Sequence, residues 1–400
     1  MNKPRLLILL NRLSVGGPAI NTLSAASILS TDFEILFVAG EPMNDEQSAD
    51  FLLEQYTGFR VEKIKSLRRS IIPGQDIRAY YRIKKIIKNF RPDIIHTHGA
   101  KPGVLGRLAA WQCKVPVIIH TFHGHVFHSY FNQVTSKGIV WVEQILAKIS
   151  TVIIAINQKL EHELIREYRI TEAKKIKLIR LGVNTESFTD PDGIKRNLFR
   201  KEFQLHDDEM AIGIIGRLVP VKQHRLFIEV AEQLIQSTKD KQRLKFFIVG
   251  DGSEKNNIIQ QLQGKEISFT IGGSAFDQTA RFIFTSWRNN MDQVYAGLDI
   301  IMLTSLNEGT PVSVMEAMAA GKPVVSTDAG GIAELIDTGK TGFIGKSSIE
   351  LKDAALLLIE MPELRKEMAV SAQKCAAERF SKLYETEQLK GLYNHLLGKQ

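Results

Sequence analysis

Short runs of apolar residues alternate with longer amphipathic stretches along almost the whole chain. The runs cover residues 6–10, 35–38, 93–97, 115–121, 151–156, 211–215, 244–249, 281–285, 299–304 and 323–327. They are continuous rather than alternating, which is typical of strands buried on both faces of a parallel sheet. Between them, apolar residues recur at helical spacing, as at Ile77, Tyr80, Ile83, Ile87 and Phe90. This alternation of strand and helix predicts an α/β fold with doubly wound parallel sheets.

The strand–helix series starts twice. A polar, poorly periodic stretch separates the first set of elements from a second set that opens at residues 211–215. We therefore predict an N-terminal Rossmann-like domain over 1–185 and a C-terminal one over 205–381, with a linker of about 186–204. We expect the last helix, 382–400, to pack back on the first domain. Because ligands bind at the carboxyl ends of strands in such sheets, the two domains are expected to face each other across a cleft.

The segment 304–334 has the most informative spacing of functional residues. A strand ends there, a loop contains Glu308 and Gly309, and Pro311 marks the start of a helix, where its missing N–H is not needed. The backbone N–H groups at such a helix start favour phosphate. Glu308 and Glu316 provide carboxylates, which accept hydrogen bonds from sugar hydroxyls. As isolated residues they would be read as solvent-exposed charges, but beside this helix start they indicate a ligand that carries both phosphate and sugar.

A second loop, after the predicted strand 211–215, contains two cations. Gly216 permits a tight turn, and Arg217 and Lys222 flank a loop that leads into a helix. Two cations at such a place neutralise a diphosphate without a metal ion.

Glycines follow two further strands. Gly16 and Gly17 come after the first strand, where they allow the backbone to approach a ligand closely. Gly250 and Asp251 form a turn after the strand at 244–249. We include all four residues in the predicted site for a ligand that carries phosphate and sugar.

Together with THGAKPGVLGRLAA at 97–110 and HTFHGH at 120–125, these motifs resemble the family 4 retaining glycosyltransferases of the GT-B fold. The resemblance extends in order over nearly the whole chain. Within the family, the chain looks like bacterial enzymes that build capsular, exopolysaccharide or O-antigen chains. The resemblance implies transfer of a hexose-type sugar from a nucleotide diphosphate donor, with UDP as the favoured nucleotide. The implied acceptor is lipid-linked or a polysaccharide.

The resemblance also implies roles for individual residues. Arg217 and Lys222 are expected to hold the donor diphosphate, which Gly17 approaches, and Glu316 to bind the ribose hydroxyls. Glu308 is expected to contact the transferred sugar and to act in catalysis. Backbone groups of Gly309, Thr310, Pro311 and Val312 are expected to line the donor. His123 is expected at the reaction centre, and His98 on the acceptor side.

The histidines His96, His98, His120, His123, His125 and His128 raise the question of a metal site. No acidic residue or cysteine accompanies them at ligand spacing, so we expect neither a metal nor another cofactor. The pattern Asp190-Pro191-Asp192 matches the metal-binding motif of another glycosyltransferase fold. It follows no apolar run and is interpreted as a turn.

Charge is unevenly distributed. The formal net charge is +8, yet residues 60–107 alone contain 13 basic and three acidic residues. Arg78, Arg82 and Lys85 follow one line of a predicted helix, which by default is a solvated face. The alternative is docking on an anionic membrane; nucleic acid is a weaker candidate because no exposed aromatics are interleaved. Two distant cysteines and no apolar run near 20 residues favour a cytoplasmic protein able to attach to the inner face of the plasma membrane.

Two other functions remain open at this point. A two-domain NAD(P)-dependent oxidoreductase would share the fold, although SVGGPAIN at 14–21 lacks the G-x-G-x-x-G turn. A non-catalytic nucleotide-sugar sensor would keep the donor residues and lack turnover.

Overall fold

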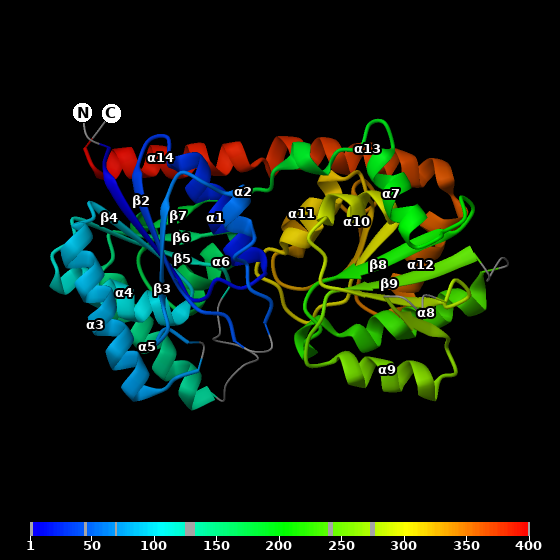
Figure 1. Ribbon diagram of the computed structural model, residues 1–400, viewed down its shortest axis with the longest axis horizontal. Helices are drawn as coiled ribbons and strands as arrows, with labels where there is room; N and C mark the ends of the chain where they lie inside the picture. Colours follow the sequence, from blue (N-terminus) through cyan, green and yellow to red (C-terminus); the bar gives the residue numbers. More distant parts are fainter. Residues whose placement is uncertain are drawn as a thin grey trace. The chain divides into compact units, whose positions relative to one another are not determined.

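The computed structural model describes residues 3–43, 46–68, 70–124, 133–238, 243–272 and 277–398. The chain divides into two compact units, Met1–Leu181 with Lys382–Gln400, and Gly182–Ser381. Within the described ranges, each unit contains one seven-stranded sheet (Figure 1). No helix in this part of the chain is both long and apolar enough to cross a membrane.

The first unit is a doubly wound parallel sheet. Its strands are β1 (Arg5–Leu10), β2 (Glu34–Gly40), β3 (Arg60–Ile64), β4 (Ile94–His98), β5 (Val117–Phe122), β6 (Val152–Ala155) and β7 (Ile176–Leu178). Its helices are α1 (Gly17–Leu29), α2 (Leu52–Gln55), α3 (Pro73–Phe90), α4 (Ala100–Gln112), α5 (Gln133–Ile149), α6 (Gln158–His162) and α14 (Lys382–Leu396). The strand order is β3-β2-β1-β4-β5-β6-β7, and all neighbours are parallel. The order reverses between β1 and β4, where such sheets bind ligands.

The side chains of β1 alternate between two hydrophobic layers. Leu6, Ile8 and Leu10 belong to a cluster that includes residues of α1 and α14. Leu7 and Leu9 belong to a second cluster, which includes residues of α3 and α4. Both faces of the strand are therefore buried, which explains why its sequence is continuously apolar.

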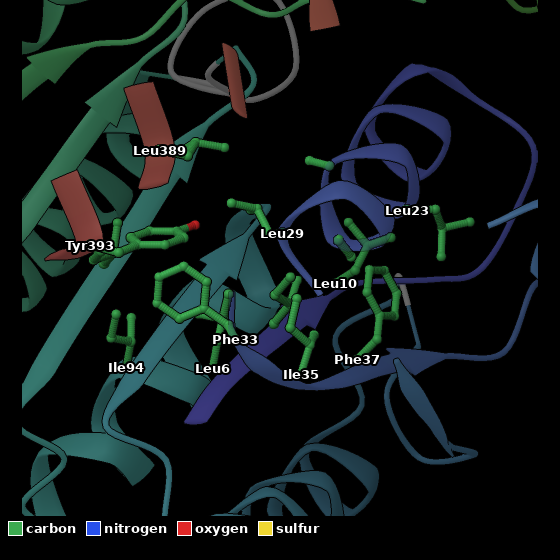
Figure 2. Close-up of a cluster of buried hydrophobic side chains, with 14 of the residues drawn as sticks. Leu6, Leu10, Leu23, Leu29, Phe33, Ile35, Phe37, Ile94, Leu389 and Tyr393 are labelled. Atoms are coloured by element: carbon green, nitrogen blue, oxygen red, sulfur yellow. The ribbon is translucent and has the colours of Figure 1, made fainter. Parts of the chain in front are cut away.

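The last helix completes the core of the first unit. Figure 2 shows Leu389 and Tyr393 of α14 beside Leu29 and Phe33. The rings of Phe33 and Tyr393 meet edge to face with centroids 5.5 Å apart. The Tyr393 hydroxyl lies 2.7 Å from Nδ1 of His96 on β4. Helix α14 therefore contributes both apolar area and a polar contact to a sheet almost 300 residues earlier in the sequence.

A buried ion pair joins α4 to α5. The guanidinium of Arg107 is fully buried and lies 2.5 Å from the Glu143 carboxylate. Arg107 Nε also donates a 2.7 Å hydrogen bond to the carbonyl of Gly103. A side chain at Gly103 would place a Cβ 2.6 Å from the His120 ring, so glycine is needed for this close packing. The pair therefore places two charges in the buried layer between α4 and α5, beside His120.

The second unit repeats the architecture. Its strands are β8 (Met210–Ile215), β9 (Leu244–Val249), β10 (Phe269–Ile271), β11 (Phe282–Ser286), β12 (Ile300–Leu303), β13 (Val324–Thr327) and β14 (Gly342–Gly345). Its helices are α7 (Ile194–Glu202), α8 (His224–Ser237), α9 (Lys255–Gly264), α10 (Met291–Gly297), α11 (Val312–Ala319), α12 (Ser348–Glu360) and α13 (Pro362–Arg379). The order is β10-β11-β9-β8-β12-β13-β14, again all parallel. Its reversal lies between β8 and β12.

Four strands lie outside the predicted apolar runs: β3, β7, β10 and β14. Each lies at the edge of its sheet. In β3 the charged sequence RVEKI leaves only its last residue buried. An edge strand is half exposed, so it lacks the continuous apolar run that identified the central strands.

The stretch expected to be a linker, 186–204, contains secondary structure that belongs to the second unit. It contains most of a short 3-10 turn, Thr185–Phe188, and the whole of α7. Phe199 of α7 is fully buried, with its ring 5.2 Å from that of Phe247 on β9. These residues are part of the second unit. Because α7 buries only Phe199 and Arg200, its sequence looked polar.

The predicted apolar face of α3 includes one residue that is not buried, so the prediction was wrong there. The helix buries Ala79, Ile83, Ile86, Ile87 and Phe90. Ile77 is instead 58% exposed, since the buried face of α3 begins only at Ala79.

We predict that Arg107→Ala lowers the free energy of unfolding by about 3–5 kcal/mol, because it leaves Glu143 buried without its partner. Thermal and urea unfolding measure the loss. The double variant Arg107→Met, Glu143→Leu should recover most of it, since both charges leave the interior together. Lys366→Ala, which removes a solvent-exposed pair with Glu363, is the matched control and should leave Tm nearly unchanged. An Arg107→Ala variant as stable as this control would contradict the prediction.

Candidate functional site

The loops after β8 and β12 are tied together in the second unit. Thr304, fully buried at the end of β12, donates its hydroxyl to the carbonyls of Lys222 at 3.0 Å and Gln223 at 3.1 Å. The backbone N–H of Leu306 donates to the carbonyl of Val221 at 2.8 Å. The two loops that carry the predicted donor residues therefore form one hydrogen-bonded surface.

Lys222 and Glu308 meet on this surface. The Lys222 ammonium lies 2.5 Å from Oε1 of Glu308, although the residues are 86 positions apart. The hydroxyl of Ser305 donates to the same oxygen at 2.5 Å. A ligand bound here meets a cation for an anionic group and a carboxylate for a hydroxyl, side by side.

A glycine pair after β13 supports the loop of Glu308. Gly330 has a left-handed backbone with φ of 61°, and a Cβ on it would lie 1.6 Å from the carbonyl oxygen of Glu308. The next residue, Gly331, donates its N–H to the carbonyl of Gly309 at 3.1 Å. This pair is not among the predicted site residues. The available signal was two adjacent glycines shortly after a predicted strand.

Helix α11 begins one residue later than expected. Pro311 is the capping residue, with φ of −72° and ψ of 110°, and Val312 is the first helical residue. The extended ψ of Pro311 excludes it from the helix. The N–H of Val314 donates to the carbonyl of Pro311 at 3.1 Å, so the N–H groups of Val312 and Ser313 precede the first intrahelical bond. Such groups, at the positive end of the helix dipole, bind anions.

Glu316 lies in the second turn of α11 and has a partner on another helix. The hydroxyl of Tyr295, on α10, donates to Oε2 of Glu316 at 2.8 Å. Burial raises the pKa of Glu316 to about 7, against the effect of the Tyr295 hydrogen bond, which lowers it. The carboxyl therefore changes its ionisation near neutral pH. Tyr295 was not selected from the sequence, where it sits in an ordinary helical pattern.

The turn after β9 needs glycine for steric reasons. A Cβ on Gly250 would lie 2.0 Å from the carbonyl oxygen of Gly216, and its φ is 133°. Gly216 in turn donates its N–H to the carbonyl of Val249 at 3.0 Å. Arg217 follows directly, half-buried at the start of its loop.

Asp251 is engaged by the protein itself. Its carboxylate accepts hydrogen bonds from Lys255 at 2.8 Å, Ser286 at 2.9 Å and the N–H of Gly252 at 2.8 Å. Burial raises the pKa of Asp251, and these bonds outweigh it, so the net pKa lies below the ordinary value. The contacts indicate that Asp251 shapes the turn; its part in donor binding stays a prediction.

In the first unit, Gly16 and Gly17 lie where α1 starts. Gly16 is extended, with φ of 162°, and caps the helix that begins at Gly17. Among the residues that the structure describes, a Cβ built on Gly16 meets no heavy atom within 4 Å. The backbone at this helix start is open to a ligand. The predicted contact with a diphosphate remains a prediction.

The histidines gather at the ends of β4 and β5. His98 was expected on the acceptor side; it is buried, with Nδ1 2.9 Å from Nε2 of His123. His96 contacts Thr121 at 2.6 Å through its Nε2. Burial, and then the charge of Lys382, lower the pKa of His123 to about 4, so its ring is neutral at pH 7. His98 is therefore placed to orient His123.

Nδ1 of His123 is buried and has no hydrogen-bond partner within the described ranges. His125 and His128 lie outside the described residues. Among the residues that the structure does describe, no group of three His, Cys, Asp or Glu side chains is arranged to hold a metal ion. The expectation of no metal stays a prediction.

Arg78, Arg82 and Lys85 lie on the exposed side of α3, as expected. Arg82 pairs with Glu62 of β3 at 2.6 Å. Two apolar side chains share this side of the helix, Ile77 and the 64% exposed Tyr81. Bases and apolar groups therefore face outward together from residues 77–85 of α3.

Two Rossmann-like units, each with predicted site residues at the reversal of its strand order, are typical of two-domain α/β enzymes that bind nucleotides. Residues 31–187 match the model of Glycosyltransferase Family 4, and residues 195–375 match that of Glycosyl transferases group 1. The chain belongs to the glycosyltransferases that combine these two domains, and its fold is GT-B. The predicted family and fold are confirmed, and the oxidoreductase alternative is set aside.

Curated relatives match over most of their length. The chain is 28% identical to a UDP-Gal:alpha-D-GlcNAc-diphosphoundecaprenol alpha-1,3-galactosyltransferase of Escherichia coli, covering 82% of each chain. It is 27% identical to an N,N'-diacetylbacillosaminyl-diphospho-undecaprenol alpha-1,3-N-acetylgalactosaminyltransferase of Campylobacter jejuni, covering 82% of this chain and 86% of that one. The structure of HepE from Anabaena in complex with UDP superposes with a TM-score of 0.78 at 22% identity, covering 98% and 100% of the two chains.

We predict that Gly330→Ala displaces the Glu308 loop, because the added Cβ has no space beside the Glu308 carbonyl and the left-handed backbone disfavours alanine. Thermal unfolding should show a clear drop in Tm. Gly339→Ala is the matched control: it has φ of +80° but, among the described residues, an open surrounding, so it tests the backbone effect alone. Equal Tm values for the two variants would show that the close contact with Glu308 has no energetic weight.

Proposed function

We propose that this protein is a retaining glycosyltransferase that needs no metal ion and takes its sugar from a UDP-sugar. The acceptor in this proposal is a glycan on a lipid carrier, in the synthesis of a cell-surface polysaccharide. The observation that carries it is the pairing of Lys222 with Glu308 beside the start of α11. Support comes from the activities of the two relatives described above, which name a UDP-sugar in one case and diphosphoundecaprenol-linked acceptors in both.

The donor diphosphate is bound by Lys222, Arg217 and the N-terminal N–H groups of α11. Departure of the nucleotide leaves negative charge on the β-phosphate, and these groups are positive where that charge develops. Lys222 is already oriented by Glu308, so little rearrangement is needed when the donor binds. A fixed cation and a helix start serve the purpose for which other enzymes use a divalent metal.

The sugar parts of the donor are bound by the two carboxylates. Glu316 accepts hydrogen bonds from the ribose hydroxyls, and Glu308 from the hydroxyls of the transferred sugar. Each carboxylate has acceptor capacity left, because Glu316 receives one protein hydroxyl and Glu308 one hydroxyl and one ammonium.

In the transfer step the bond from the sugar's anomeric carbon to the β-phosphate oxygen breaks, and a bond to the acceptor oxygen forms on the same face. The acceptor proton passes to the departing phosphate, so no carboxylate nucleophile is required. In this proposal the neutral ring of His123, which His98 orients, contacts the sugar that is transferred.

The exposed side of α3 attaches the protein to the inner face of the plasma membrane. Arg78, Arg82 and Lys85 attract anionic headgroups, and each base near the surface adds about 1 kcal/mol. Ile77 and Tyr81 are exposed on the same helix and suit the boundary between headgroups and acyl chains. Such attachment brings the enzyme to a lipid-linked acceptor.

We expect UDP-sugars to raise Tm and to be slowly hydrolysed to UDP with EDTA present, because the cations of the site are side chains. Arg217→Ala and Glu316→Ala should abolish donor binding, measured by calorimetry. His123→Ala should keep donor binding and lose rate. The control Lys366→Ala should bind donor normally. A strict requirement for a divalent ion, or tight donor binding by both donor-site variants, would overturn the proposal, and binding without turnover to any acceptor would favour a sensor.

We expect reversal of Arg78, Arg82 and Lys85 to Glu to abolish sedimentation with phosphatidylglycerol vesicles, because electrostatic attraction becomes repulsion. Phosphatidylcholine vesicles should not bind either protein. The matched control reverses Lys201, Lys366 and Lys374, which are exposed in the second unit and change the net charge equally. Loss of binding in both triple variants would point to net charge alone; retention in the first would remove α3 from the proposal.

A further inference from the structure

Tyr295 is a fully buried tyrosine whose hydroxyl is directed at a carboxylate. It lies on α10, which precedes β12, and its hydroxyl lies 2.8 Å from Oε2 of Glu316. A buried hydroxyl without a partner is destabilising, so the bond satisfies Tyr295 as well as Glu316. Packing alone would be served equally by phenylalanine. The hydroxyl therefore has its main consequence at Glu316.

The position of Tyr295 is held from several sides. Its ring meets that of Phe188 edge to face, with centroids 5.5 Å apart. The following carbonyl, that of Ala296, accepts a 2.8 Å hydrogen bond from the ammonium of Lys322. Arg196 contacts the carbonyls of Ala296 and Gly297 at 3.4 Å each. Two cations thus cap the end of α10, where the helix dipole is negative, and keep Tyr295 in place.

The bond constrains Glu316 in two ways. It fixes one oxygen, Oε2, and so sets the rotation of the carboxylate plane in the second turn of α11. It also favours the ionised form, because a hydroxyl donates a stronger hydrogen bond to a charged carboxylate oxygen than to a neutral one. A carboxylate in this state has further lone pairs with which to accept from two neighbouring hydroxyls.

We propose that Tyr295 is a positioning residue for donor recognition, which orients Glu316 as a double acceptor for the vicinal hydroxyls of the nucleotide's ribose. This inference rests on the proposed function, in which Glu316 contacts the ribose. Tyr295 itself touches no substrate. Its effect on donor binding runs entirely through Glu316.

The test compares UDP with 2′-deoxy-UDP and 3′-deoxy-UDP by calorimetry, for the wild type and Tyr295→Phe. We expect the wild type to prefer UDP by about tenfold, as is usual for a hydrogen bond to a charged group. Tyr295→Phe should raise the dissociation constant of UDP by about tenfold and those of the deoxy nucleotides by about threefold at most. With a UDP-sugar, KM should rise while kcat stays near the wild-type value. If Tyr295 had a purely structural role, the substitution would weaken the binding of all three nucleotides by the same factor.

Two further variants check the route through Glu316. Glu316→Gln should remove the preference for UDP, and adding Tyr295→Phe to it should have little extra effect. Phe188→Leu keeps the hydroxyl but removes the ring contact, and should reduce the preference partly; it also serves if Tyr295→Phe folds poorly. Tyr80→Phe, which removes a hydroxyl bonded to Gln112 at 2.6 Å in the first unit, is the matched control and should keep the full preference.

The outcomes separate two failures. A wild type that binds UDP and its deoxy forms equally, or not at all, contradicts the proposed function and this inference with it. A wild type that prefers UDP, with an equal preference in Tyr295→Phe, overturns the role of Tyr295 and leaves the donor site intact.

Discussion

The parallel pairing of β8 with β12 is the constraint on which the donor site depends. It registers Ile300 with Ile212 and Met302 with Ile214, so the two strands end together. The loops that follow are then close enough for Thr304 to bond the carbonyls of Lys222 and Gln223. Without this tie, Lys222 and Glu308 would be distant residues on separate loops. The pairing of Lys222 with Glu308 is thus a consequence of strand register, transmitted through the bonds that Thr304 and Leu306 make to the Lys222 loop.

Ion pairs stabilise charges that the fold removes partly or fully from water. Arg107 is buried and paired with Glu143 in the first unit, and the half-buried Lys222 is paired with Glu308 in the second. Glu316 differs, because it accepts a hydrogen bond from a neutral hydroxyl, and burial raises its pKa to about 7. A carboxylate with a neutral partner keeps capacity for a ligand's hydroxyls. The sites differ because a cation lies beside the carboxylates of Glu143 and Glu308, whereas a neutral hydroxyl lies beside that of Glu316.

Close backbone contacts set the shape of the donor loops. Gly250 sits against the carbonyl of Gly216, and Gly330 against that of Glu308. Neither position has space for a Cβ, so the loops approach each other more closely than side chains would allow. In the first unit, Gly103 plays a similar part beside His120. At these positions glycine allows two protein segments to pack closely. For Gly16, the sequence suggested instead a close approach to a ligand.

The sequence by itself determined the central strands, their alternation with helices and the two-unit plan, because strands covered on both faces must be apolar throughout. It also located the loops of Arg217, Lys222 and Glu308, since glycine and proline mark where strands end and helices start. The tertiary structure alone decided the edge strands, the burial of α7, the pairing of His98 with His123, and the bond between Tyr295 and Glu316. Those features depend on contacts between distant segments, and local spacing carries no information about which side chains the fold brings into contact.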